Sequence, residues 1–251
     1  MLSYQHIYHA GCLADVHKHA ALSIILSKMV EKDKSIYYME THAGRGLYDL
    51  NSDESQKTGE ANAGITKLRN KLPPKHPYTK LLESLPKNIY PGSPLIAHKI
   101  LRPIDRLFLS ELHPQEFSAL KNNMGNYSNV FVHDDNGYKK VLALSPPIVR
   151  RGLVLIDPSY EVKTEYADAA EFVKKLHKKW PEAVIMLWYP ILQSGYHKEM
   201  CAILKTAELP KFWQQEVNFK NGGNTLGSGL VICNLPYGTE NGLDAAKSIF
   251  K

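Results

Sequence analysis

The most informative stretch of this chain is residues 153–160, LVLIDPSY, in which four aliphatic residues lead directly into Asp157, Pro158, Ser159 and Tyr160. A continuous apolar run of this length predicts a strand covered on both faces, as in the parallel sheet of an α/β protein. Such a strand delivers a carboxylate, a rigid turn and an aromatic ring to one point. A strand that merely ends at an Asp-Pro turn has the same sequence pattern, so these residues alone leave both interpretations open.

The same residues suit one kind of chemistry. An exocyclic amino group on a nucleobase is a poor nucleophile until acceptors take hydrogen bonds from its N–H groups. Asp157 and the carbonyl of Pro158 have the right chemistry for those acceptors. Tyr160 offers a ring on which a base can stack after it leaves its helix, since every base has a π-face.

Other apolar runs extend the sheet. Strands are expected at residues 36–39, 107–109, 130–132 and 184–188, and helical patterns lie between several of them, at 115–124 and 166–179. Alternation of this kind predicts right-handed crossovers and a mainly parallel sheet. Residues 212–219 and 229–233 flank an Asn-Gly-Gly-Asn turn at 221–224 and predict a C-terminal antiparallel hairpin. A further helix with one apolar face is expected over residues 20–31.

The gap between the first two expected strands, residues 40–106, is twice the length that one crossover requires. We therefore expect one α/β domain, residues 1–52 and 91–251, with a small helical subdomain inserted at 53–90. Helical patterns at 63–72 and 78–85 fall within the insertion. A lobe beside the sheet can grip a polymer or be a simple decoration, and the sequence favours neither.

Composition sets wider limits. The chain has 251 residues, 43% hydrophobic, with a net charge of +6 and three widely spaced cysteines. The positive charge favours a polyanionic partner, and the cysteine spacing suggests neither a disulfide framework nor a cysteine zinc site. No apolar run approaches a membrane span, and the first residues lack the order of a signal peptide. We expect a cytoplasmic protein without a membrane partner.

Polar or glycine-rich residues follow each of the first four expected strands. The first strand leads into ETHAGRG at residues 40–46, which includes His42 and Gly44; the second ends at Glu111; the third ends in HDDNG at 133–137, which includes Asn136 and Gly137; the fourth ends at Asp157. Each alone fits a turn or a solvated strand end. Together, in this order, they match a Rossmann-like S-adenosylmethionine-dependent methyltransferase. The glycine loop suits a ligand with an amino-acid tail, the acid suits ribose hydroxyls, and the polar turn suits an adenine edge.

The N-terminus concentrates titratable residues. Within sixteen positions it holds Tyr4, His6, His9, Asp15, His17, Lys18 and His19. A metal site is one interpretation, but the spacing matches no metal motif and Lys18 would repel a cation. We expect no metal, with Lys18 or His19 near the carboxylate of the cofactor and Tyr4 near the target base.

Many short motifs resemble one family, RlmJ, whose members are bacterial 23S ribosomal RNA adenine-N6 methyltransferases. They include MLSY at 1–4, HAG at 9–11, THAG at 41–44, TGE at 58–60, YPGSP at 90–94, ELHP at 111–114, RRGL at 150–153 and WYP at 188–190. The likeness extends over nearly the whole chain.

The resemblance implies S-adenosylmethionine as cofactor, 23S ribosomal RNA as partner, protein-free or early in ribosome assembly, and a monomer. It implies cofactor contacts from His19, His42, Ser93, Glu111, the Asn136-Gly137 turn and Asp157, in addition to Lys18 and Gly44. It implies Asp157 as the catalytic residue, beside Pro158 and Tyr160, and Tyr4 as a substrate contact.

Two positions depart from the family pattern. Ser159 stands where the family has the second proline of Asp-Pro-Pro-Tyr, and Asn136 stands where it has aspartate, unless Asp135 supplies that acid after a one-residue shift. Two other functions share the sequence pattern. One is a DNA adenine-N6 methyltransferase, and the other is a non-catalytic RNA-binding protein that kept the fold.

Overall fold

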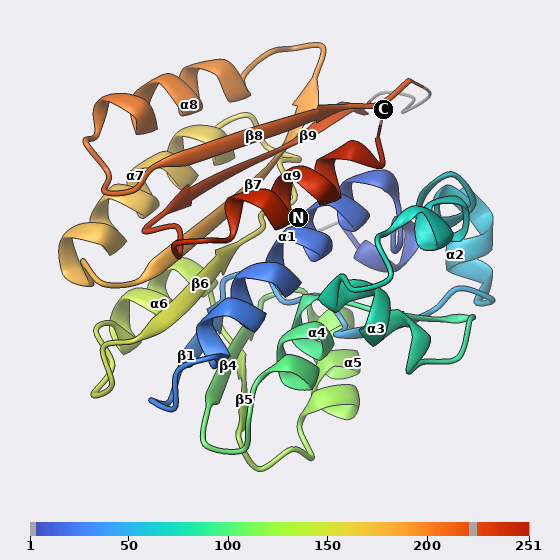
Figure 1. Ribbon diagram of the computed structural model, residues 1–251, viewed down its shortest axis with the longest axis horizontal. Helices are drawn as coiled ribbons and strands as arrows, with labels where there is room; N and C mark the ends of the chain where they lie inside the picture. The colour runs from blue at the N-terminus through green and yellow to red at the C-terminus, as the bar shows by residue number, and fades with distance from the viewer. Residues whose placement is uncertain (1–3, 221–224, 251) are drawn as a thin grey trace.

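The computed structural model describes residues 4–220 and 225–250, which form a seven-stranded sheet in the order β5-β4-β1-β6-β7-β9-β8 (Figure 1). Five neighbouring strands are parallel: β1 (Tyr37–Glu40), β4 (Arg106–Glu111), β5 (Val130–Asp134), β6 (Gly152–Ile156) and β7 (Val184–Leu192). Every residue of β6 is buried, as its continuous apolarity predicts. The predicted parallel sheet is confirmed.

The C-terminal strands reverse direction. β9 (Thr225–Cys233) pairs antiparallel with both β7 and β8 (Trp213–Asn218), so the predicted hairpin is confirmed, although its expected turn at 221–224 lies outside the described residues. The chain begins in the middle of the sheet at β1, moves outward to β5 and then crosses back to β6. At such a switch point the carboxyl ends of neighbouring strands border a ligand-binding crevice.

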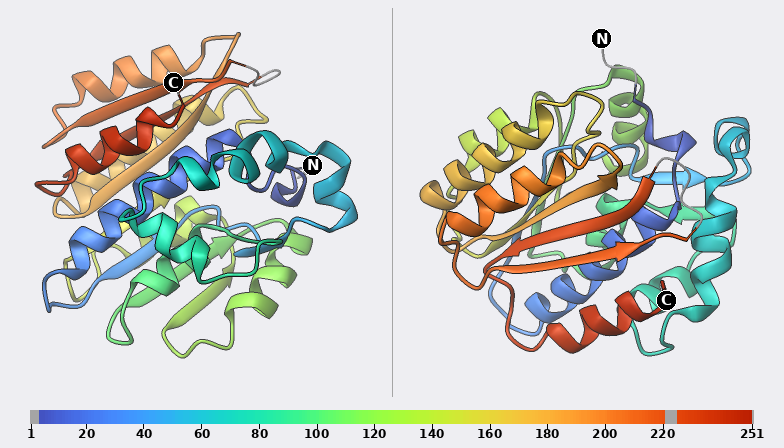
Figure 2. Two further views of the ribbon diagram at one scale, coloured as in Figure 1. Left: turned by 45° about the vertical axis from the view of Figure 1, so that its right-hand side comes forward. Right: turned by 90° about the horizontal axis from the view of Figure 1, so that it is seen from above.

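Helices cover both faces of the sheet (Figure 2). One face carries α1 (Leu13–Val30), α4 (Ser93–Ile100), α5 (Pro114–Met124) and α9 (Glu240–Ser248). The other carries α6 (Gly137–Leu144), α7 (Glu165–Lys179) and α8 (His197–Thr206). The two buried apolar clusters lie on these two faces, with Leu153 and Leu155 of β6 in one cluster and Val154 and Ile156 in the other. The central strand therefore ends between two packed layers that hold its carboxyl end rigidly.

Helix α1 differs from the expectation. It begins at Leu13, seven residues before the predicted start, and its first turns bury Asp15, His17, Lys18 and His19. A sequence periodicity argument looks for one apolar face and one polar face. This half of α1 is buried around its circumference and carries polar side chains, so the pattern that marks an amphipathic helix is missing.

The expected insertion lies between two short antiparallel strands, β2 (Leu47–Asp49) and β3 (Ile89–Pro91). It contains α2 (Asp53–Thr58), a π-helical turn (Asn62–Thr66), a 3-10 turn (Arg69–Lys71) and α3 (Pro77–Glu83). The predicted helix at 63–72 is irregular, because Gly64 leaves helical geometry where its backbone packs against the Gly11 carbonyl. The division of the chain into a main domain and an inserted subdomain stays a prediction.

Candidate active site

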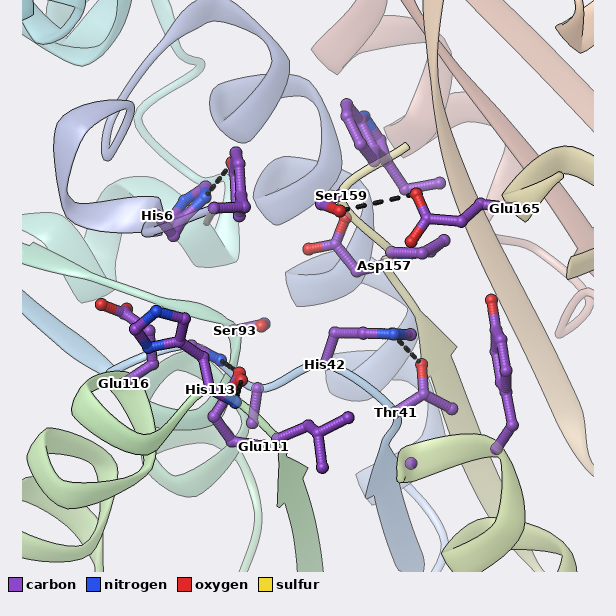
Figure 3. A pocket seen from close by; sticks show the side chains of 18 of the residues that line it. His6, Thr41, His42, Ser93, Glu111, His113, Glu116, Asp157, Ser159 and Glu165 are labelled. Atoms are coloured by element: carbon purple, nitrogen blue, oxygen red, sulfur yellow. Dashed lines mark hydrogen bonds between the residues drawn. The ribbon is translucent and has the colours of Figure 1, made fainter. Parts of the chain in front are cut away.

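A cavity of about 630 Å³ opens at the carboxyl edge of the sheet, a size typical of small-molecule sites. Side chains from the N-terminal segment, α1 and the ends of β1, β4 and β6 surround it. Figure 3 labels His6, His42, Glu111 and Asp157 among them. The predicted site residues that line it are Tyr4, Lys18, His19, His42, Gly44, Ser93, Glu111, Asn136, Gly137, Asp157 and Pro158. Tyr160 is missing from this lining.

Asp157 directly follows β6 and is held by a buried lysine. Lys18 Nζ lies 2.6 Å from Asp157 Oδ2 and 3.0 Å from Asp15 Oδ1. The Lys18 side chain is 4% exposed and that of Asp157 is 15% exposed. Burial opposes the charged ammonium, but the two carboxylates outweigh it and raise the pKa of Lys18 above its ordinary value. Asp157 thus faces a permanent positive charge on one side and the cavity on the other.

Asp15 connects Lys18 to the N-terminal segment. Its Oδ2 accepts hydrogen bonds from the Gly11 amide at 2.9 Å and from His6 Nε2 at 2.9 Å. His6 Nδ1 lies 2.8 Å from the Tyr4 hydroxyl, and the Tyr4 ring stacks on His9. Burial favours the neutral acid, but the charges of His6 and Lys18 outweigh it and lower the pKa of Asp15 well below its ordinary value. One buried carboxylate therefore organises Lys18, His6 and, through His6, Tyr4.

The acid at the end of β4 is arranged as an acceptor. Glu111 accepts hydrogen bonds from the amides of Gly44 at 2.9 Å and His113 at 2.8 Å, and burial raises the pKa of its carboxyl group. Each carboxylate oxygen retains a further lone pair on a side chain that lines the cavity. Gly44 has a positive φ of 59°, and a β-carbon there would collide with the Tyr48 hydroxyl, so the loop requires glycine.

The turn after β5 begins helix α6. Asn136 caps that helix by accepting a hydrogen bond from the Lys139 amide at 3.1 Å, and Gly137 packs so closely on the Thr41 carbonyl that no side chain fits. Asp135 pairs with Lys140 at 3.2 Å and does not line the cavity. Of the two alternatives for this turn, the structure brings Asn136 to the cavity.

Two of the predicted histidines contribute neutral rings. Burial lowers the pKa of His42 to about 4, and its Nδ1 lies 2.8 Å from the Thr41 hydroxyl. Burial also lowers the pKa of His19 well below its ordinary value, and its Nδ1 bonds the Tyr90 hydroxyl at 2.7 Å. Both are neutral at physiological pH and present hydrogen-bonding edges rather than charges.

Ser93 depends on a residue that the sequence analysis missed. Its hydroxyl donates to Glu40 Oε2 at 2.9 Å, and Glu40 also accepts from the Tyr38 hydroxyl. Glu40 is fully buried, and burial raises its pKa to about 8. The sequence signal that could have identified Glu40 is its position at the end of β1. Only the fold shows that its carboxyl group bonds the Ser93 hydroxyl.

The structure differs from the expectation for Tyr160. Its backbone has a φ of 56°, and its hydroxyl donates to the Trp188 carbonyl at 2.7 Å. The residue is 6% exposed and its ring packs against Tyr166. A left-handed conformation is unusual for an aromatic residue, and here it accompanies a ring that is buried outside the cavity lining. Trp188, which the sequence analysis had noted only within a strand and a motif, does line the cavity. Its ring centroid lies 5.6 Å from Nζ of Lys18, the lysine that pairs with Asp157.

Toward the residues that the structure describes, Ser159 makes only long hydrogen bonds. Its hydroxyl lies 3.5 Å from Glu165 Oε2 and 3.5 Å from the Glu161 amide (Figure 3). Contacts of this length contribute little. The turn between Asp157 and Tyr160 therefore does not depend on the serine hydroxyl.

The N-terminal histidines diverge in the fold. His6 bonds Asp15, His17 bonds Ser228 and Gln215, and His19 bonds Tyr90. Within residues 4–220 and 225–250, no three His, Cys, Asp or Glu side chains gather in a way that would hold a metal ion. In the same described part of the chain, no helix is both long and apolar enough to cross a bilayer.

The donors and acceptors around the cavity fit an adenosine-like cofactor with an amino-acid tail. Glu111 supplies acceptors for ribose hydroxyls, the start of α6 at Asn136 and Gly137 supplies backbone groups for a base edge, and Gly44 allows close backbone approach. Ser93, His19 and Lys18 border the remaining space. Beside it stand Asp157 and the carbonyl of Pro158, the acceptors that an amino group requires.

Comparison with known proteins agrees with this geometry. The model of the family described as "Ribosomal RNA large subunit methyltransferase D, RlmJ" matches residues 33–250. Ribosomal RNA large subunit methyltransferase J is 39% identical in Haemophilus influenzae and 36% identical in Escherichia coli, each covering 96% of this chain and 89% of the relative.

Among solved structures, a Legionella pneumophila protein superposes with a TM-score of 0.87 at 33% identity, covering 96% of this chain and 92% of its own. Human methyltransferase-like protein 13, in complex with SAH, superposes with a TM-score of 0.52 at 12% identity, covering 94% of this chain and 92% of its own. The latter likeness is one of fold: the two chains share a Rossmann-like α/β sheet.

Proposed function

Because the chain belongs to the RlmJ family of ribosomal RNA large subunit methyltransferases, we propose that it methylates the exocyclic N6 amino group of an adenine in 23S ribosomal RNA. The observation that carries the proposal is the position of Asp157 and Pro158 on the cavity wall, with Lys18 holding the carboxylate. The net charge of +6 suits an RNA partner. The expected substrate is ribosomal RNA that is protein-free or at an early stage of ribosome assembly. The enzyme is expected to be a monomer in the cytoplasm.

The cofactor is S-adenosylmethionine, which when bound supplies a methyl group activated by a sulfonium centre. Glu111 would hold its ribose, Asn136 and Gly137 its adenine edge, and Lys18, His19 and Ser93 its amino-acid end. His42, neutral in its buried position, would border the nucleoside without repelling the sulfonium. Gly44 would allow the backbone to approach.

Asp157 and the Pro158 carbonyl would accept hydrogen bonds from the two N–H groups of the target amine. These contacts would orient the nitrogen, and most of the rate would come from this alignment, on the order of 7 to 11 kcal/mol in well-oriented reactions. Methylation makes the N–H acidic, so the Asp157 carboxylate suffices to take the proton and pass it to water. Lys18 would keep that carboxylate in place through the reaction.

Trp188 and Tyr4 would contact the faces of the extruded base. Both line the cavity together with Asp157, and aromatic side chains bind unstacked bases through their π-faces. Tyr160 would act indirectly, because its hydroxyl bonds the Trp188 carbonyl and its ring meets the Trp188 ring edge-on, with the centroids 5.9 Å apart.

The test is methyl transfer from labelled S-adenosylmethionine to protein-free 23S ribosomal RNA in competition with duplex DNA, followed by mapping of N6-methyladenine. We expect label in the RNA at an adenine. Preference for the duplex would support a DNA methyltransferase instead. Calorimetry that detects no S-adenosylmethionine binding would support a non-catalytic RNA-binding protein.

Substituting Ser159→Pro restores the family pattern and is expected to leave turnover unchanged or raise it. The two long hydrogen bonds of the serine hydroxyl contribute little, and proline restricts the unfolded chain, which stabilises a compatible turn by about 0.4–1 kcal/mol. Steady-state kinetics and thermal unfolding check both effects. A sharp loss of turnover in a folded variant would show that Ser159 has a role of its own.

A further inference from the structure

Behind the cavity wall, a chain of polar side chains leads away from Trp188; it is buried as far as Gln215 and ends at the exposed Asp244. The indole Nε1 lies 2.9 Å from Ser228 Oγ, which lies 2.9 Å from His17 Nδ1. His17 Nε2 lies 3.2 Å from Gln215 Oε1, and Gln215 Nε2 lies 3.1 Å from Asp244 Oδ1. We call these four supporting residues, His17, Gln215, Ser228 and Asp244, the indole relay. They come from α1, β8, β9 and α9.

The two ends of the indole relay fix the direction of every hydrogen bond. The Trp188 indole can only donate, and the Asp244 carboxylate can only accept. Ser228 must therefore accept from Trp188 and give its single proton to His17 Nδ1. The proton of His17 then lies on Nε2 and is donated to the Gln215 carbonyl oxygen, which leaves the Gln215 amide to donate to Asp244.

The surroundings agree with that assignment. His17 is 1% exposed and Ser228 is fully buried, and burial lowers the pKa of His17 to about 4. The ring is therefore neutral at physiological pH and has the free Nδ1 lone pair that the chain of bonds requires. A buried polar group left without a partner is unfavourable, so the three buried members, His17, Gln215 and Ser228, hold one another in one orientation.

We propose that the indole relay is a positioning device that fixes the plane of Trp188 at the base-binding side of the cavity; this inference rests on the proposed function. Helix α1 then serves two adjacent parts of the site, since Lys18 holds Asp157 and its neighbour His17 holds Trp188. The residues of the indole relay touch neither base nor cofactor and act through the indole. Their effect on catalysis should therefore disappear when the indole N–H is absent.

A double-mutant cycle with Ser228→Ala and Trp188→Phe tests the proposal. Ser228→Ala should lower kcat/KM for 23S ribosomal RNA by about 2- to 10-fold, the equivalent of one hydrogen bond. In the Trp188→Phe background the same substitution should have no further effect, whereas a general loss of stability would appear in both backgrounds. Equal effects of Ser228→Ala in the two backgrounds would overturn the proposal.

A second measurement reads the indole directly. The protein has three tryptophans. When they are replaced by 5-fluorotryptophan, the fluorine resonance of Trp188 is the one that Trp188→Phe removes. Ser228→Ala should shift or broaden that resonance alone, and Ser23→Ala, which changes a buried serine of α1 bonded to the Ala20 carbonyl, should not. An unmoved Trp188 resonance would refute the relay. If the wild-type protein methylates no adenine, the proposed function fails, and the fluorine measurement still decides the relay.

Discussion

Replacing Asp157 with asparagine is expected to lower the rate of methyl transfer by about 10²- to 10⁴-fold, the range that a positioned proton acceptor contributes. Asparagine keeps the shape and one carbonyl oxygen but loses the negative charge. It cannot take the proton that the methylated nitrogen releases, and its NH₂ group competes with the amine as a donor. It also removes the 2.6 Å ion pair with Lys18, so the orientation of the acceptor is lost together with its basicity.

Single-turnover methylation of 23S ribosomal RNA measures this effect on the chemical step, and calorimetry measures S-adenosylmethionine binding, which we expect to weaken but remain detectable. Asp157→Ala should abolish methyl transfer while leaving S-adenosylmethionine binding measurable. Asp53→Asn, an exposed aspartate of the inserted segment, provides a matched control and should retain the wild-type rate. Full activity in Asp157→Asn would show that neither the charge nor the proton acceptor of Asp157 is used.

The sheet was predictable because its strands are continuous apolar runs. Residues 153–156 predict the buried strand β6, and Asp157 at its end predicts the site, since position at a strand end is a local property of the sequence. The order of four such strand ends then identifies the cofactor fold. In the structure Glu111, Gly137 and Asp157 indeed line one cavity, because parallel strands bring their carboxyl ends to the same edge.

What the sequence did not reveal depends on contacts between distant segments. The polar first half of α1 has no amphipathic pattern, because Asp15, His17 and Lys18 each meet a different partner in the folded chain. The direction of the Tyr160 ring is set by its positive φ and by the Trp188 carbonyl, neither of which a motif encodes. For the same reason, Gln215 was recognisable only as a strand residue, and Ser228 lay just before the expected strand at 229–233.

Lys18→Met is expected to lower the free energy of unfolding by about 3–5 kcal/mol at neutral pH, because it leaves Asp15 and Asp157 in the fold without the ammonium between them. Lys28→Met is a matched control on the same helix. Lys28 pairs with Glu31 at 2.7 Å, but both side chains are exposed, so this loss should stay below about 1 kcal/mol. Urea denaturation compares the two, and equal losses would contradict a structural role for the Lys18 pairs.

The loss of stability in Lys18→Met is expected to depend on pH. In the wild-type protein the lowered pKa of Asp15 contributes stability that is present above its unfolded value near 3.9 and is lost as pH falls through the lower folded value. Without Lys18 the Asp157 carboxylate disfavours the charge of Asp15, and the pKa of Asp15 rises. The stability that remains in Lys18→Met should therefore fall as pH rises through that pKa, so the difference in unfolding free energy from the wild type should be largest near pH 7 and smaller toward pH 4. Adding Asp15→Asn to Lys18→Met removes one of the unpaired charges and should recover part of the stability at pH 7. Methyl transfer should not return in the double variant, because Asp157 still lacks the ammonium that orients it toward the base.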